Sequence, residues 1–69
     1  MALNYTYHYA EFEIDTGLCI GVFSTTTTCS GDCIVEIPVY DDEYIDKYYI
    51  DGNWYEDAEG TIPWTSSML

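Results

Sequence analysis

One histidine and three cysteines are the residues best suited to act as bases and nucleophiles or to bind zinc: His8, Cys19, Cys29 and Cys33. Covalent catalysis by a cysteine–histidine pair needs a third group that orients the histidine, and the sequence singles out none. A zinc site with three cysteines and one histidine uses these ligands, but the Cys-x2-Cys spacing of a zinc knuckle is absent. A single histidine on the inner face of a strand is more often a packed core residue than a base. We therefore expect no enzymatic activity, no metal site and no cofactor.

The cysteines are odd in number, and no secretory signal precedes them, which argues against a disulfide framework. We expect reduced thiols that pack as small hydrophobic side chains or lie in a turn. In an oxidising setting, Cys29 and Cys33 could close a small disulfide loop.

Carboxylates dominate the charge of the chain. Thirteen Asp and Glu residues face one cation, Lys47, and the formal net charge is -12. Phosphate binding requires Lys and Arg, so we expect no direct nucleic-acid binding, and anionic membranes are disfavoured for the same reason. The expected partner is a host protein with a basic surface, such as the nucleic-acid groove of an enzyme. The alternative is that the charge only keeps a tyrosine-rich fold soluble and monomeric.

Two acidic groups could attract calcium. One consists of Asp41, Asp42, Glu43 and Asp46, and the other of Asp51, Asn53 and Glu56. Neither follows the spacing of a calcium-binding loop, because a glycine comes directly after Asp51. These carboxylates are expected to form a solvated face and a turn.

Regularly spaced carboxylates can imitate a phosphate backbone. Glu11, Glu13 and Asp15 alternate along an expected strand, which places neighbours roughly 6.6–6.8 Å apart on one face. Such a surface could occupy a basic groove, with its field steering the encounter, and tyrosines between the charges would add contact area. The candidate partner-binding residues are Glu11, Glu13, Asp41, Asp42, Glu43, Tyr44, Asp46, Trp54 and Trp64.

Short strands must position these side chains. Residues 5–14 alternate with the period of a strand, with His8, Ala10, Phe12 and Ile14 on the inner face and Tyr5, Tyr7, Tyr9, Glu11 and Glu13 on the outer face. A turn at 15–17 leads into a second run, 18–23, whose even positions Leu18, Ile20 and Val22 would extend the apolar face. A third strand is expected at 33–37, where Pro38 ends it or confines it to an edge.

The second half of the chain has two local signals. Residues 41–47 are the one candidate helical turn, with an acidic start that suits a helix N-terminus. Residues 48–56 predict a hairpin around Asp51-Gly52, in which Tyr49 faces Trp54. The expected fold class is mainly β: a small antiparallel meander of about five short strands with at most one short helical turn.

A chain of 69 residues forms one domain at most. We expect a compact β-rich domain at 1–56 and a C-terminal tail at 57–69, in which Trp64 either docks back onto the sheet or anchors a partner. No signal peptide or membrane span is visible, so we expect the sequence to be the complete reading frame of a cytosolic protein. The exposed edges of a short sheet also make a homodimer plausible.

Four segments of the sequence resemble small domains that are common in bacteriophage proteins, often on or near tail and baseplate components. The similar segments are Tyr9–Val22, Val35–Pro38, Tyr40–Tyr49 and Asp51–Glu56. The resemblance covers about two thirds of the chain and implies a phage origin and a compact antiparallel meander. It carries over no catalytic residues. The chain departs from the pattern in its Thr25–Cys33 loop, its tail and its near absence of lysine.

These observations lead to one expected function and one alternative. The expected function is that of a phage-encoded accessory protein that binds and inhibits a host protein, a component of antiviral defence, in the bacterial cytoplasm. The alternative is a structural component of the virion, such as a tail or capsid decoration subunit. Co-purification with intact particles would separate the two.

Overall fold

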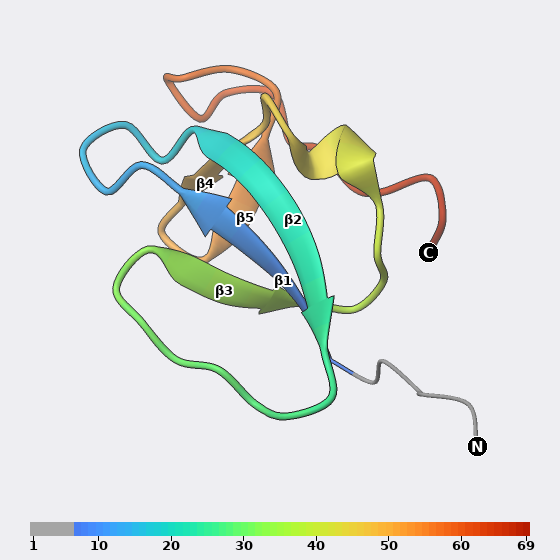
Figure 1. Cartoon of the computed structure of the whole chain (residues 1–69). Helices are drawn as coiled ribbons and strands as arrows, with labels where there is room; N and C mark the ends of the chain where they lie inside the picture. The colour runs from blue at the N-terminus through green and yellow to red at the C-terminus, as the bar shows by residue number, and fades with distance from the viewer. Residues whose placement is uncertain (1–6) are drawn as a thin grey trace.

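Five short strands and one 3-10 turn make up the regular structure of the chain. The computed structural model describes residues 7–69, and the part of the N-terminal strand expected before Tyr7 lies outside them. The elements in chain order are β1 Tyr7–Phe12, β2 Cys19–Thr25, β3 Ile34–Ile37, the 3-10 turn η1 Asp42–Tyr44, β4 Tyr48–Ile50 and β5 Asn53–Tyr55 (Figure 1). All strand pairs are antiparallel, and residues 7–69 contain no α-helix. The predicted mainly-β class, with about five strands and one short helical turn, is confirmed.

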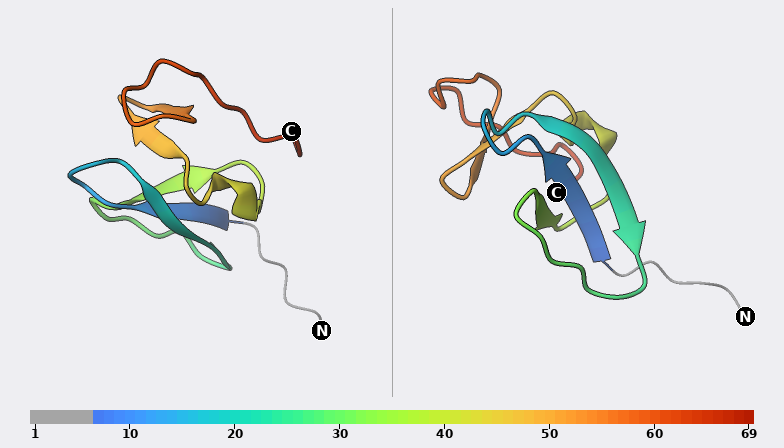
Figure 2. Two further views of the ribbon diagram at one scale, coloured as in Figure 1. Left: turned by 90° about the horizontal axis from the view of Figure 1, so that it is seen from above. Right: turned by 60° about the vertical axis from the view of Figure 1, so that its left-hand side comes forward.

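The strands form two sheets rather than one. β1 is the central strand of a three-stranded sheet with the order β2-β1-β3, and β4 pairs with β5 in a separate hairpin. β3 therefore pairs with β1 and not with β2, which departs from the sequential order of a simple meander. Figure 2 shows the hairpin and the C-terminal segment as a second layer on one side of the three-stranded sheet.

A bulge between β1 and β2 decides which residues enter the core. Glu11 pairs with Gly21, but Phe12 pairs with Cys19, so Ile20 is the extra residue on β2. An extra residue reverses the inward and outward alternation along the strand. Cys19 is therefore fully buried, whereas Ile20 is 52% exposed. The prediction that Ile20 continues the apolar face is wrong for this reason.

The core lies between the three-stranded sheet and the second layer. Its buried residues are Ala10, Cys19, Ile37 and Tyr44, and the partly buried residues against them are Val22, Val35, Trp54 and Trp64. Ala10 pairs with Val22 on one side and with Val35 on the other, so one face of β1 carries the core across all three strands. Ile14, which was predicted on this face, is 63% exposed because β1 ends at Phe12.

The opposite face of the sheet has a smaller apolar contact of its own. Tyr9 was predicted on the outer face with Glu11, but it is only 3% exposed. Its ring stacks on Phe23 with centroids 5.4 Å apart, and its hydroxyl accepts a hydrogen bond of 2.8 Å from the backbone N–H of Cys29. The long connection between β2 and β3 thus covers Tyr9, which period-2 alternation alone does not indicate.

The β4–β5 hairpin has the predicted turn. Asp51 and Gly52 both have positive φ, 51° and 86°, as a two-residue turn of type I′ requires. Tyr49 pairs with Trp54, and their rings lie 5.1 Å apart, which confirms the predicted cross-strand contact. The backbone of Tyr49 also donates to the carbonyl of Gly17 at 2.8 Å, which connects the hairpin to the β1–β2 turn.

The C-terminal segment runs along the free side of β5. The N–H of Glu56 donates to the carbonyl of Ile62 at 2.9 Å, and the N–H of Trp64 donates to the carbonyl of Trp54 at 3.0 Å. Residues 57–62 between them form a loop that the Asp57 carboxylate closes by accepting hydrogen bonds from Thr61 and Ile62. Among residues 7–69, no helix is long and apolar enough to cross a membrane.

Candidate functional site

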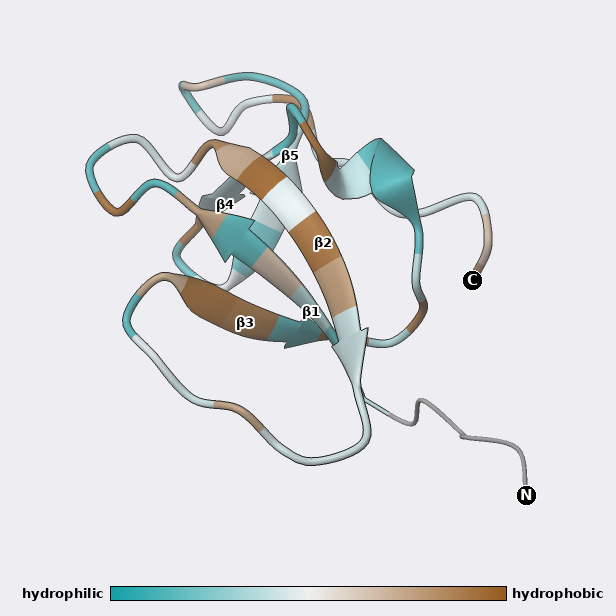
Figure 3. Cartoon of the chain, viewed as in Figure 1, coloured by the Kyte–Doolittle hydropathy of each residue, from teal (hydrophilic) through white to brown (hydrophobic). Residues whose placement is uncertain are grey.

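The exposed carboxylates at Asp42, Glu43 and Asp46 form the acidic turn, which follows β3 and precedes the hairpin. Its backbone is held to β2, because the N–H of Asp46 donates to the carbonyl of Cys19 at 3.0 Å and the N–H of Cys19 donates to the carbonyl of Lys47 at 2.8 Å. In Figure 3 this segment is largely hydrophilic. The three carboxylates are therefore presented from a fixed backbone.

Asp41 has a different role from its acidic neighbours. It is only 4% exposed, and its side chain caps η1 by accepting a hydrogen bond of 2.9 Å from the N–H of Glu43. The hydroxyl of Ser66 donates a second hydrogen bond to the same carboxylate. The prediction that Asp41 contacts a partner is therefore replaced by a structural role, because both carboxylate oxygens are used inside the protein.

Tyr44 is also a structural residue. It is 3% exposed, and its ring lies edge-on to Trp54 and Trp64, with centroids 4.9 Å and 4.8 Å away. Burial raises the pKa of its hydroxyl, and the nearby Asp41 carboxylate raises it further. Tyr44 thus forms the centre of an aromatic cluster and is not available as the exposed contact residue that was predicted.

The carboxylates of the first half of the chain do not form the expected row. Glu11 is exposed on β1, but β1 ends at Phe12, so Glu13 and Asp15 lie in the connection to β2 and not on a strand. Glu13 accepts a hydrogen bond of 3.1 Å from the hydroxyl of Thr16. The predicted regular spacing of three carboxylates on one face is wrong.

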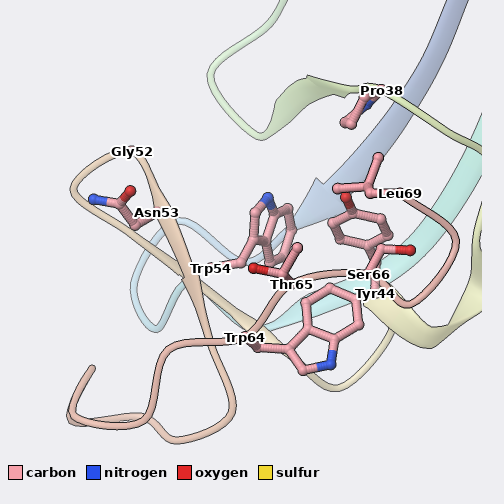
Figure 4. Close-up of a pocket in the computed structure, with 9 residues that line it drawn as sticks. All are labelled: Pro38, Tyr44, Gly52, Asn53, Trp54, Trp64, Thr65, Ser66 and Leu69. Carbon is pink, nitrogen blue, oxygen red and sulfur yellow. The ribbon is translucent and has the colours of Figure 1, made fainter.

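Trp54 and Trp64 line a cleft of about 250 Å³ next to the acidic turn. Figure 4 shows the indoles of Trp54 and Trp64 with Tyr44, Ser66 and Leu69 beside them and Pro38 above. Both tryptophans are partly buried, and the Nζ of Lys47 lies 5.0 Å from the centroid of the Trp64 ring. The sequence identified the two tryptophans as candidates but did not indicate that they share a cleft, since they belong to β5 and to the C-terminal segment.

The single histidine lies next to a serine hydroxyl. His8 and Ser24 pair across β1 and β2, and a hydrogen bond of 2.7 Å joins the Nδ1 of His8 to the Oγ of Ser24. The ring of Tyr40 lies edge-on to the His8 ring, with centroids 6.5 Å apart. Within residues 7–69, no three His, Cys, Asp or Glu side chains are arranged to hold a metal ion.

No protein-family model, curated protein or solved structure matches this chain. The structural features that bear on its function are the acidic turn, the cleft and the charge distribution.

Proposed function

We propose that this chain is an acidic binding protein that inhibits a host protein by occupying a basic surface, such as a nucleic-acid groove. The observation that carries the proposal is the distribution of charge. Every carboxylate except Asp41 and Asp57 is in an exposed residue, and the one lysine lies against Trp64. The electric field of a chain with a formal net charge of -12 attracts basic proteins over a long range and accelerates their encounter.

The acidic turn is the part of this surface best suited to specific binding. Its three carboxylates lie within five residues of sequence, on a backbone fixed by the Asp41 cap and by two hydrogen bonds to Cys19. Groups that are already held in place lose little conformational entropy when a partner binds. Glu11 adds a further exposed carboxylate on β1.

The phage origin rests on the resemblance to phage domains. Given that origin, the small size and high charge of the chain favour an inhibitor of an antiviral-defence protein in the bacterial cytoplasm. An inhibitor that occupies a nucleic-acid groove needs outward carboxylates and no cationic patch, and the chain meets both requirements. The proposal contains no catalytic step.

The experiment is a pull-down from a bacterial lysate, with the tagged protein as bait, nuclease added and two salt concentrations. A triple variant, Asp42→Asn/Glu43→Gln/Asp46→Asn, removes the charge of the acidic turn. Its matched control, Asp32→Asn/Glu36→Gln/Glu59→Gln, removes the same charge from exposed positions elsewhere. We expect one basic protein to be retained by the unaltered bait and by the control, less so in high salt, and to be lost with the acidic-turn variant. Equal retention by both variants would contradict the role of the turn.

The alternative is a virion subunit, and the open edges of the sheet favour it. β2 and β3 are the outer strands of the three-stranded sheet, and within residues 7–69 the acidic turn covers the edge of β2 only at Cys19. Unpaired strand edges are where chains add to one another. A subunit of the particle must be present in purified virions, whereas an inhibitor need not be. Mass spectrometry of purified particles from infected cells distinguishes the two functions.

A further inference from the structure

We infer that the cleft between Trp54 and Trp64 receives an arginine side chain of the basic partner. This inference rests on the proposed function and adds a specific anchor to it. The proposed function needs only a negative surface, whereas the cleft provides a shaped aromatic site for one side chain.

The size of the cleft indicates the kind of occupant. At about 250 Å³ it is smaller than the roughly 300–1,000 Å³ clefts that enclose cofactors and other small molecules. A single long side chain fits such a volume. Hot spots of protein interfaces are commonly single aromatic or arginine side chains in pockets of this kind.

The aromatic walls are held in place from inside the protein. Trp54 and Trp64 both pack edge-on against the buried ring of Tyr44, at interplanar angles of 72° and 81°. Trp64 is also fixed by its backbone hydrogen bond to Trp54. The indoles are therefore preorganised, and little entropy is lost when a side chain enters between the walls of the cleft.

The charge selects a cation. The chain carries thirteen carboxylates and one lysine, so its net charge repels anions and attracts cations. The Nζ of Lys47 already lies 5.0 Å from the centroid of the Trp64 ring, which is within the distance of a cation–π interaction. The Trp64 indole thus accepts a cation in the folded protein itself.

The remaining lining favours arginine over lysine. Ser66 lines the cleft, and its hydroxyl donates to the buried Asp41 carboxylate, so a negative charge lies directly behind the wall. Thr65 also lines the cleft, and its hydroxyl is a further oxygen acceptor. A planar, weakly hydrated guanidinium can stack on an indole and donate to such acceptors at the same time, which a strongly hydrated ammonium does less well.

The test uses the unaltered protein and three capped tripeptides, Gly-Arg-Gly, Gly-Lys-Gly and Gly-citrulline-Gly, followed by NMR of the indole N–H signals. Citrulline has nearly the shape of arginine without its charge. We expect the arginine peptide to shift both indole signals in a saturable manner, the lysine peptide to bind about 2- to 5-fold more weakly, and the citrulline peptide to have no effect. Unmoved indole signals, or equal shifts from arginine and citrulline, would overturn the inference.

Variants locate the site. Trp54→Phe and Trp64→Phe keep an aromatic ring against Tyr44 but weaken its attraction for a cation, so each should weaken arginine binding while the amide spectrum remains that of the folded protein. Tyr40→Leu is the control, because Tyr40 is an exposed aromatic residue outside the cleft. Equal loss in all three variants would contradict the assignment. If the cleft fails these tests but the acidic turn still retains the basic partner, only the arginine site is wrong and the proposed function stands.

Discussion

The hydroxyl of Ser66 donates a hydrogen bond to the buried carboxylate of Asp41, 25 residues earlier in the chain. This contact joins the C-terminal segment to the cap of the acidic turn. It also places the last part of the chain beside the aromatic cleft, so both parts of the candidate site depend on the same polar pair.

Ser66→Ala should therefore destabilise the fold. It leaves a buried carboxylate oxygen without its partner, and such losses cost about 1–3 kcal/mol, or more when the group is charged. Urea denaturation measures the change in the free energy of unfolding. The neighbouring exposed Ser67→Ala is the control and should change it by less than about 0.5 kcal/mol. Equal stability of both variants would show that the Asp41–Ser66 hydrogen bond contributes nothing.

Three glycines should respond differently to replacement by alanine. Gly17 has φ of 79°, and a Cβ there would lie 2.5 Å from the carbonyl oxygen of Tyr49. Gly52 has φ of 86° but open space around a Cβ, and Gly21 has neither constraint. Positive φ costs an L residue about 1–2 kcal/mol, and the clash adds to this cost at Gly17.

The expected order of destabilisation is thus Gly17→Ala first, then Gly52→Ala, with Gly21→Ala near zero or slightly stabilising. Thermal unfolding of the three variants in one buffer checks the order. A Gly17→Ala variant as stable as Gly52→Ala would contradict the close approach between the β1–β2 turn and the hairpin.

Asp57 should make the stability of the loop at 57–62 depend on pH. Its carboxyl pKa lies below the ordinary value of 3.8, chiefly because the hydroxyl of Thr61 and the backbone N–H of Ile62 donate hydrogen bonds to it. For a carboxyl group with a lowered pKa, the stabilisation is fully present above the pKa of the unfolded state and is lost as pH falls through the lower, folded value.

The difference in stability between the unaltered protein and Asp57→Asn should therefore be constant near neutral pH and shrink below about pH 4. Denaturation at a series of pH values measures it. A difference that persists unchanged in strong acid would contradict this account of Asp57.

The cysteines should react in an order set by burial. Cys29 is exposed, Cys33 is partly buried and Cys19 is fully buried. Burial raises the pKa of the Cys19 thiol, so little thiolate is present to react at neutral pH. With iodoacetamide and mass spectrometry of the folded protein, we expect labelling of Cys29 first, then Cys33, and of Cys19 only after denaturation. Early labelling of Cys19 would show that it is not enclosed beneath the acidic turn.

Local patterns predicted the strands well. Alternation indicated β1, and Asp51-Gly52 indicated the hairpin with its Tyr49–Trp54 pair, because a turn and its flanking residues are determined by neighbours in sequence. The bulge at Ile20 was not predicted. An extra residue on one strand can be recognised only from its pairing with the partner strand, which the period-2 pattern of a single strand does not contain.

The candidate site was predicted less completely, because its residues depend on distant partners. Asp41 and Asp42 are adjacent and chemically alike, yet only Asp41 is buried, since Ser66 reaches it from the C-terminal segment. Tyr44 was expected as a contact residue but is covered by Trp54 and Trp64. No local signal distinguishes an exposed acidic residue from one that caps a turn against a distant hydroxyl.

The most direct test of the central claim is the salt dependence of binding between this protein and the basic partner that the pull-down retains. The measurement is the Kd at several salt concentrations for the unaltered protein, the acidic-turn triple variant and its charge-matched control. We predict that binding weakens as salt rises and that the acidic-turn variant binds roughly 3- to 100-fold more weakly than the control, with a shallower salt dependence. Binding that is insensitive to salt, or equal for the two variants, would contradict the claim that the acidic turn recognises a basic surface.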